Sequence, residues 1–242
     1  MSMTKEEKIE NFKQLVNQSN HIVFFGGAGV STESGIPDFR SKDGLYHQKY
    51  DYPPEEILSR TFFDRKTEEF YRFYRDKLNS LKYEPNVTHY KLAELEQRGK
   101  LKAIVTQNID GLHQKAGSQN VLELHGSVLR NYCMKCGKFH DAAFVFGSEG
   151  VPHCECGGIV KPDVVLYEES LNNRIIEQSV QAIANADLLI VAGTSLTVYP
   201  AAGLIRYFKG DNLVLINRDA TPYDSAANLV INESMGEIFK AI

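Results

Sequence analysis

The pattern of apolar and polar positions along the chain predicts a parallel β-sheet covered by helices. Five short apolar runs lack alternation with polar residues, which is typical of strands buried on both faces of a parallel sheet. These runs are residues 21–25, 102–107, 187–193, 212–217 and 228–231. Apolar residues at helical spacing predict helices over about residues 5–18, 88–100 and 174–186. Helices that alternate with buried strands predict an α/β fold with a doubly wound parallel sheet.

Two segments interrupt this alternation. Residues 41–81 are rich in aromatic side chains, and residues 126–161 contain all four cysteines. We expect both segments to be insertions that together build a smaller domain. The main domain then consists of residues 1–40, 82–125 and 162–242.

Composition and charge narrow the class of protein. Of the 242 residues, 43% are hydrophobic and 24% are charged, as in soluble globular proteins. The formal net charge is −4 and the basic residues are scattered, so we expect no binding to nucleic acid. The first residues lack the apolar core of a signal peptide, and no apolar run is long enough to span a bilayer. The sequence therefore predicts a cytoplasmic protein that does not bind membranes.

A glycine-rich turn follows the first predicted strand. Gly27, Ala28 and Gly29 would allow backbone N–H groups to approach a pyrophosphate. The dinucleotide fingerprint G-x-G-x-x-G would begin at Gly27, but its third glycine position is occupied by Thr32. No acidic residue ends a second strand at the expected distance. The turn alone is therefore as consistent with a ligand-free connection as with a nucleotide site.

Polar residues at other strand ends favour a ligand site. "TQNID" at residues 106–110, "GTSL" at residues 193–196 and Asn217 each follow an apolar run. Open α/β sheets bind ligands at the carboxyl ends of their strands, where these groups would converge. The side chain of Asn217 could hydrogen-bond a ribose hydroxyl. The sequence thus predicts a nucleotide site at this edge of the sheet.

The cysteines have the spacing of a zinc site. They form a C-x₂-C pair and a C-x-C pair separated by seventeen residues: Cys133, Cys136, Cys154 and Cys156. Four thiolates fill a tetrahedral site and leave no position for water, so the metal would be structural. His140 and His153 are close enough in sequence to replace a ligand, and reduced thiols without metal are the alternative. We expect four cysteine ligands and one Zn²⁺.

The longer motifs resemble those of a known family. "GAGVSTESGIPDFR", "TQNIDGLH", "LHG", the cysteine pairs and "GTSLTVYPAA" occur in the order found in sirtuins of the bacterial type, which are NAD-dependent protein-lysine deacylases. The match covers about residues 24–217. The resemblance implies a Rossmann-like NAD-binding main domain, with a zinc-ribbon module and a helical module in the smaller one. It also implies that NAD is consumed as a co-substrate, giving nicotinamide, O-acetyl-ADP-ribose and free lysine.

The resemblance implies roles for individual residues. The ADP-ribose part of NAD would be held by Ala28, Thr32, Arg40, Thr194, Ser195 and Asn217. Gln107 would border the nicotinamide ribose, and the nicotinamide pocket would contain Ile36, Phe39, Asn108, Ile109 and Asp110. His125 resembles the general base, with Asn108 as the second catalytic residue. An imidazole suits proton transfer near neutral pH. We expect His113 and Asp38 to have structural roles.

Some positions depart from the family pattern or bear on the substrate. Glu168 stands where the family often has glycine, and Gly26 where it usually has threonine or serine. Residues 164–167 would add a backbone ladder to an extended acetylated peptide. Sirtuins that prefer succinyl-lysine or malonyl-lysine resemble one another in a Tyr-x-x-Arg pair. Here Tyr71 is present but Tyr74 occupies the arginine position, which favours neutral acyl groups, unless both tyrosines simply face the core.

Other functions remain open at this point. A zinc-ribbon nucleic-acid module would need a basic face around the cysteines, where acidic residues instead dilute the lysines. An oxidoreductase would leave His125 and the cysteines without roles. A protein ADP-ribosyltransferase would use the same cleavage of NAD and is the alternative that the sequence excludes least. We expect a monomer that binds acetylated protein lysines as extended peptides.

Overall fold

The computed structural model describes residues 3–38 and 52–242. Its larger sheet has six strands, all parallel to their neighbours, in the order β3-β2-β1-β7-β8-β9. The strands are β1 (Ile22–Gly26), β2 (Leu101–Thr106), β3 (Val121–Glu123), β7 (Leu188–Ala192), β8 (Asn212–Ile216) and β9 (Leu229–Ile231). β1 lies between β2 and β7, so successive strands run outward from it in both directions. The predicted doubly wound α/β fold is confirmed.

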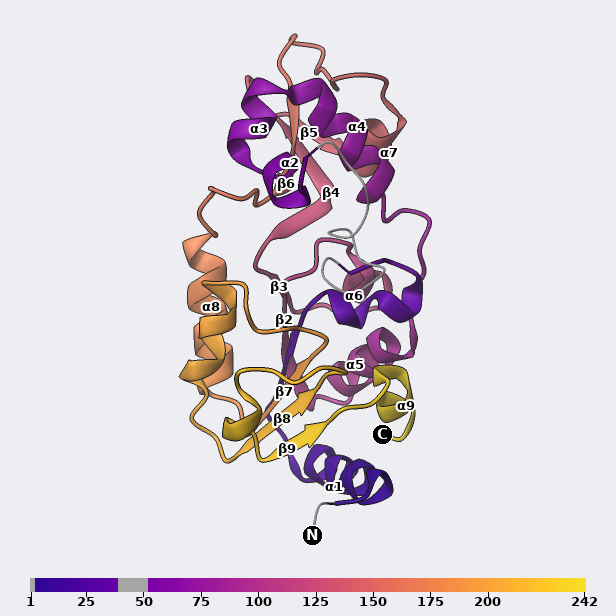
Figure 1. The fold of residues 1–242 in the computed structure, drawn as a ribbon, viewed down its shortest axis with the longest axis vertical. Coiled ribbons are helices and arrows are strands. Elements are labelled where there is room, and N and C mark those ends of the chain that lie inside the picture. The colour runs from indigo at the N-terminus through magenta and orange to yellow at the C-terminus, as the bar shows by residue number, and fades with distance from the viewer. Residues whose placement is uncertain (1–2, 39–51) are drawn as a thin grey trace.

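Helices cover both faces of this sheet, as Figure 1 shows for α8 on one side and α5 and α9 on the other. The first face packs against α1 (Lys5–Gln18), α5 (Val87–Gln97) and α9 (Met235–Lys240). The second packs against α8 (Asn173–Ala184) and η4 (Ala201–Tyr207). Adjacent strand residues point to opposite faces. Phe24 therefore joins the first core and Phe25 the second.

A smaller antiparallel sheet lies at the other end of the molecule (Figure 1), in the order β5-β4-β6. Its strands are β4 (Gly126–Cys133), β5 (Phe139–Asp141) and β6 (Val160–Val164). The neighbouring helices are α2 (Pro54–Ile57), α3 (Arg60–Arg65), α4 (Thr67–Lys77) and α7 (Ala142–Gly147). Phe63 and Phe70 from these helices share one core with Val128 and Val160 from the sheet. The two inserted segments therefore pack together.

The remaining short elements connect these parts. Within residues 3–38 and 52–242 they are η1 (Ala28–Val30), η2 (Thr32–Ser34), α6 (Leu112–Lys115) and η5 (Asp224–Ala226). The glycine-rich turn thus leads into two short 3₁₀ helices. No helix in the described part of the chain is both long and apolar enough to cross a membrane.

Candidate functional site

A cavity of about 540 Å³ lies at the carboxyl edge of the parallel sheet. Loops that follow β1, β2, β7 and β8 contribute to its lining, which also includes part of the segment after β6. The volume lies within the range of small-molecule sites. Doubly wound sheets bind ligands at the carboxyl ends of their strands, next to the strand from which the strand order runs outward in both directions, which here is β1. The strand-end groups singled out in the sequence therefore meet in one place.

Every predicted nucleotide-site and catalytic residue in the described part of the chain lines this cavity. These residues are Ala28, Thr32, Ile36, Gln107, Asn108, Ile109, Asp110, His125, Thr194, Ser195 and Asn217. Phe39 and Arg40 lie outside the described residues. Asp38 also borders the cavity.

The glycine-rich turn packs directly against the loop after β7. The Gly29 N–H donates to the Gly193 carbonyl oxygen over 2.8 Å. A Cβ atom added at Gly29 would lie 2.7 Å from the Gly193 Cα atom, and one at Gly27 would lie 2.9 Å from the Gly193 oxygen. Neither distance leaves room for a side chain. Gly27 and Gly29 are therefore needed so that the two loops can meet. This requirement does not depend on whether the third glycine of the dinucleotide fingerprint is present.

His125 is largely enclosed at the wall of the cavity. Its Nδ1 atom lies 3.0 Å from the Gln107 carbonyl oxygen. A carbonyl can only accept, so Nδ1 must carry the hydrogen, which leaves the Nε2 lone pair of the neutral ring available. Burial lowers the pKa of His125 below its usual value of 6.5, against an opposing effect of the hydrogen bond to Gln107. The fold therefore favours a neutral ring with its hydrogen on Nδ1. Such a ring can accept a proton at Nε2.

A hydrogen-bonded chain of three residues lines the same cavity. Ser31 donates from Oγ to Asp110 Oδ2 over 2.6 Å, and Asn108 donates from Nδ2 to Ser31 Oγ over 3.2 Å. Asp110 Oδ1 accepts from the Leu112 N–H over 2.9 Å. Burial raises the pKa of Asp110, while the bonds from Ser31 and Leu112 oppose that rise. Ser31 was not anticipated from the sequence, where it is one serine in a turn.

Side chains also join separate strand-end loops. Gln107 donates from Nε2 to Thr194 Oγ1 over 3.0 Å, which links the loops after β2 and β7. Thr194 Oγ1 also accepts from the Leu196 N–H over 3.2 Å. Asn217 Nδ2 donates to the Asp219 carbonyl oxygen over 2.8 Å. These bonds hold the cavity wall in one arrangement.

His113 is buried and is not part of the cavity lining. Its ring is 4.8 Å from that of His89 and 6.1 Å from that of Phe24, measured between centroids. Burial lowers the pKa of His89 to about 4 and that of His113 well below 6.5. Both rings are neutral at physiological pH. This location is consistent with the structural role expected for His113.

Tyr71 and Tyr74 do not face the cavity. Both side chains are completely buried in the core of the smaller sheet and its helices. Tyr71 donates its hydroxyl to the Val160 carbonyl oxygen. The Tyr74 ring stacks on Phe70 and Phe146, with centroid distances of 5.6 and 5.3 Å. The alternative that both tyrosines face the core is therefore borne out, and Tyr74 carries no information on the acyl group, whose preference stays a prediction.

The predicted backbone ladder at residues 164–167 is largely occupied within the chain. The Val165 N–H donates to the His125 carbonyl oxygen over 3.0 Å. The Leu166 N–H donates to Glu169 Oε2 over 2.9 Å, and the Tyr167 N–H to the Leu58 carbonyl oxygen over 3.0 Å. Lys161 Nζ donates to the Val164 carbonyl oxygen over 3.1 Å. An extended peptide would therefore find few free N–H groups along these four residues.

The four cysteines form a compact group beside β4. Their sulfur atoms all lie within 4.8 Å of one another, with Cys133 and Cys156 at 3.4 Å and Cys136 and Cys154 at 3.7 Å. Zn–S bonds of about 2.3 Å in a tetrahedron place sulfur atoms about 3.8 Å apart. The donor set and its spacing fit a zinc ion. The group contains neither His140 nor His153.

Comparison with known proteins identifies the family of this chain. The model of the Sir2 family matches residues 27–200. The chain belongs to the Sir2 family. The match spans the glycine-rich turn, His125 and all four cysteines, so the predicted sirtuin resemblance is confirmed.

Curated Sir2 relatives match over nearly the whole chain. The NAD-dependent protein deacetylase of Clostridium acetobutylicum is 62% identical over 240 residues, covering 98% of each chain. That of Clostridium perfringens is 60% identical over 237 residues, covering 96% of this chain and 97% of its own.

Solved Sir2 structures share the fold. One contains a deacetylated p53 peptide and 3′-O-acetyl-ADP-ribose, is 38% identical, covers 96% of both chains and has a TM-score of 0.88. Another, with a p53 peptide and NAD⁺, is 38% identical, covers 96% of this chain and 95% of its own, and has a TM-score of 0.84.

Proposed function

We propose that this protein is an NAD-dependent protein-lysine deacetylase that consumes NAD as a co-substrate. The products would be nicotinamide, O-acetyl-ADP-ribose and the free lysine side chain. The observation that carries the proposal is the convergence of His125 and the strand-end residues in one cavity. Sir2 relatives named as NAD-dependent protein deacetylases, at up to 62% identity, support the same activity.

The strand-end loops have the chemistry to hold NAD. Thr194, Ser195 and Asn217 offer hydroxyl and amide groups for the ADP-ribose part, with Ala28 and Thr32 on the glycine-rich turn. Asp110 would accept from the nicotinamide carboxamide, and its carboxylate is oriented by Ser31 and the Leu112 N–H. Ile36, Asn108 and Ile109 would enclose the ring.

NAD supplies a cationic leaving group, so the cleavage needs a substrate oxygen held in line at the ribose carbon rather than a strong acid. The fold contributes the later proton transfer. His125 would accept a proton from a ribose hydroxyl at Nε2, because Nδ1 is already committed to Gln107. Asn108 would help to hold the reacting groups through its amide. A positioned base of this kind contributes about 10²–10⁴-fold to the rate.

The remaining features follow from the same proposal. The protein would act in the cytoplasm as a monomer on acetylated protein lysines, and would bind neither nucleic acid nor membranes. Four cysteines would hold one structural Zn²⁺. The chain would divide into a main NAD-binding domain of residues 1–40, 82–125 and 162–242, and a small domain of residues 41–81 and 126–161.

The decisive experiment mixes the protein with NAD and an acetyl-lysine peptide. Mass spectrometry should detect nicotinamide, deacetylated peptide and acetyl-ADP-ribose in equal amounts. Labelled ADP-ribose attached to protein, without loss of the acetyl group, would instead indicate a protein ADP-ribosyltransferase. Peptide that stays acetylated in the presence of NAD would contradict the proposal.

A further inference from the structure

Residues 165–169, here called the wall segment, line the cavity on the side of the smaller sheet. The segment is bonded at its start to the candidate base, since the Val165 N–H donates to the His125 carbonyl oxygen. Further along, the Tyr167 N–H donates to the Leu58 carbonyl oxygen, and the Tyr167 carbonyl oxygen accepts from the Arg60 N–H, each over 3.0 Å. The wall segment therefore connects His125 to the start of α3.

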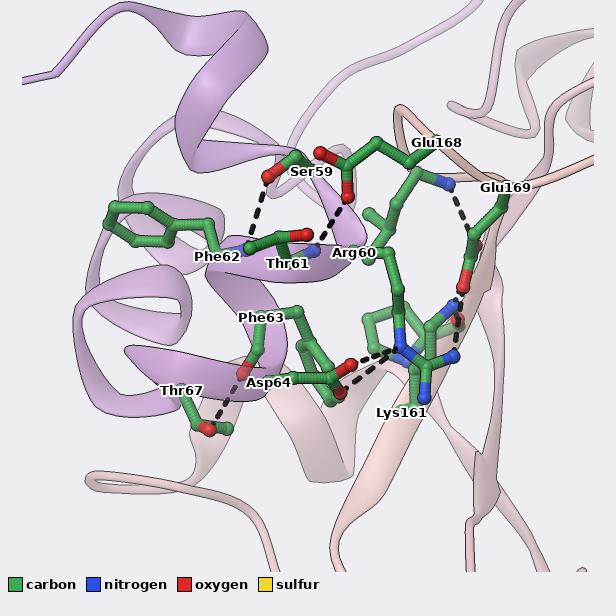
Figure 2. Close-up of polar contacts among 12 residues, drawn as sticks. Ser59, Arg60, Thr61, Phe62, Phe63, Asp64, Thr67, Lys161, Glu168 and Glu169 are labelled. Atoms are coloured by element: carbon green, nitrogen blue, oxygen red, sulfur yellow. Dashed lines mark hydrogen bonds and ion pairs between the residues drawn. The ribbon is translucent and has the colours of Figure 1, made fainter.

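Glu168 adopts a backbone conformation that is uncommon for a residue with a side chain. Its φ is 76°, in the left-handed region that glycine enters readily. Its carboxylate compensates for this strain, because Oε2 accepts from the Thr61 N–H over 2.8 Å. Thr61 lies in the first turn of α3, where N–H groups have no partner within the helix. Figure 2 shows Glu168 directed at this turn beside Ser59, whose Oγ accepts from the Phe62 N–H over 3.1 Å.

Glu169 anchors the same segment from the next position. Its Oε2 accepts from the Leu166 N–H over 2.9 Å and lies 3.2 Å from Lys161 Nζ. Its Oε1 lies 3.1 Å from an Arg60 guanidinium nitrogen, which Figure 2 also shows. Two adjacent carboxylates thus bind α3 and the β6 side of the wall segment. A glycine in place of Glu168 could adopt the same backbone but would make no bond to α3.

The wall segment and the strand-end loops reach the cavity from different sheets. The strand-end loops that would hold NAD come from the parallel sheet, whereas the wall segment continues from β6 of the smaller sheet. Tyr167 in the wall segment and Tyr199 in the loop after β7 both line the cavity and are exposed, by 41% and 60%. Exposed aromatic side chains at a cavity favour contact with a second, peptide-like substrate.

We propose that Glu168 is a positioning residue: its bond to α3 holds the wall segment where it contacts the acyl-peptide substrate. The inference rests on the proposed deacetylase function. It requires that loss of the carboxylate weakens peptide binding while leaving NAD binding and the chemical step intact. It also requires that freeing the backbone alone, with glycine, does not replace the carboxylate.

The test compares Glu168→Ala, Glu168→Gly and Glu168→Gln in the full-length protein with an acetyl-lysine peptide and NAD. For the alanine and glycine variants we expect the peptide KM to rise about fivefold, with kcat and the NAD KM within about twofold of wild type. The glutamine variant should recover part of the loss, because its amide oxygen can accept from the Thr61 N–H. A glycine variant with wild-type peptide KM would overturn the proposal.

Two matched variants separate this role from general destabilisation. Ser59→Ala removes the other cap of α3 without touching Glu168, and Glu177→Ala removes an exposed glutamate on α8. Neither should raise the peptide KM, and an equal rise in Ser59→Ala would show that the stability of α3 alone is responsible.

Amide hydrogen exchange provides a readout that does not depend on activity. Residues 165–169 should exchange faster in Glu168→Ala and Glu168→Gly than in Ser59→Ala, and equal exchange rates would also overturn the proposal. Failure of the wild-type protein to form acetyl-ADP-ribose would instead contradict the proposed function.

Discussion

The Nδ1 atom of His125 is hydrogen-bonded to the backbone carbonyl oxygen of Gln107, the residue that directly follows β2. One strand end thereby sets both the orientation and the tautomer of the candidate base. Gln107 itself is held on its other side, because its N–H donates to the Gly26 carbonyl oxygen over 2.9 Å. The position of the base therefore depends on the central strand of the sheet.

Replacement of His125 tests this arrangement. We expect His125→Ala to retain NAD binding but to lose about 10²–10⁴-fold in kcat, since the positioned base is removed. Binding is measured by calorimetry and turnover by acetyl-ADP-ribose formation. His21→Ala, which changes a histidine at the amino end of β1, should behave as wild type. Near-normal turnover of His125→Ala would show that His125 is not the general base.

The pH dependence of the wild-type protein gives a second test. His125 must be neutral to accept a proton, and burial lowers its pKa below 6.5. Protonation of the ring therefore needs a lower pH than for an ordinary histidine, so kcat/KM should stay level near neutrality and fall only in acid, below the usual histidine value of 6.5. The profile of kcat/KM for NAD reports this group in the free enzyme. A decline that begins above pH 7 would contradict the lowered pKa.

Ser31 should prove important for NAD binding. Its hydroxyl bonds to the buried Asp110 carboxylate, and a hydrogen bond to a charged group contributes roughly 1.5–3 kcal/mol. We expect Ser31→Ala to raise the NAD KM at least about tenfold. Ser118→Ala is the matched control, since Ser118 is equally buried but its hydroxyl has no partner among the described residues. A similar NAD KM in both variants would exclude the role of Ser31.

The core location of Tyr74 predicts a contrast with Tyr71. The Tyr74 hydroxyl is buried and has no partner within the described part of the chain, whereas the Tyr71 hydroxyl bonds to Val160. Tyr74→Phe should therefore leave the free energy of unfolding unchanged or raise it by up to about 1 kcal/mol. Tyr71→Phe should lower it by about 1 kcal/mol. Denaturant unfolding measures both, and the ratio of acetyl to succinyl kcat/KM should not change in Tyr74→Phe.

Removal of metal should unfold the smaller sheet. Structural zinc binding is coupled to folding, so the cysteine group should hold one zinc per chain and Cys136→Ser should lower both zinc content and the melting temperature. Atomic emission and thermal unfolding provide the measurements. His153→Ala is the control, because that ring lies outside the cysteine group. Unchanged melting after chelation would show that the sulfur atoms hold no structural ion.

The fold was predictable where burial alone determines the local pattern. The five predicted strands are present: β1 and β7 are completely buried, and β2, β8 and β9 are buried at most positions. The helix predicted over residues 5–18 is α1. The three-residue strand β3 was missed, because it is short and ends in Glu123. The strand ends also indicated the cavity, since parallel strands direct their carboxyl ends to one edge.

Features that depend on distant contacts were not predictable. Ser31 has no sequence signal that separates it from other turn serines, and its importance arises only when Asp110 and Asn108 fold against it. The direction of Tyr74 depends on how α4 packs against α7. Glu168 was noted as a departure from glycine, but its partner Thr61 lies 107 residues earlier. The roles of the individual site residues and the domain boundaries stay predictions.

The central position of β1 has a consequence for folding during synthesis. Phe24 lies beside Ile104 on one side and Ile190 on the other, so this strand obtains its second neighbour only when the last quarter of the chain is available. During synthesis, β1 must therefore wait for β7 before it is paired on both sides. Pairings between residues so far apart make folding slow, because a long loop must close before its contacts form. Until then one edge of β1 has no strand partner, and an unpaired strand edge makes an incomplete chain prone to aggregation.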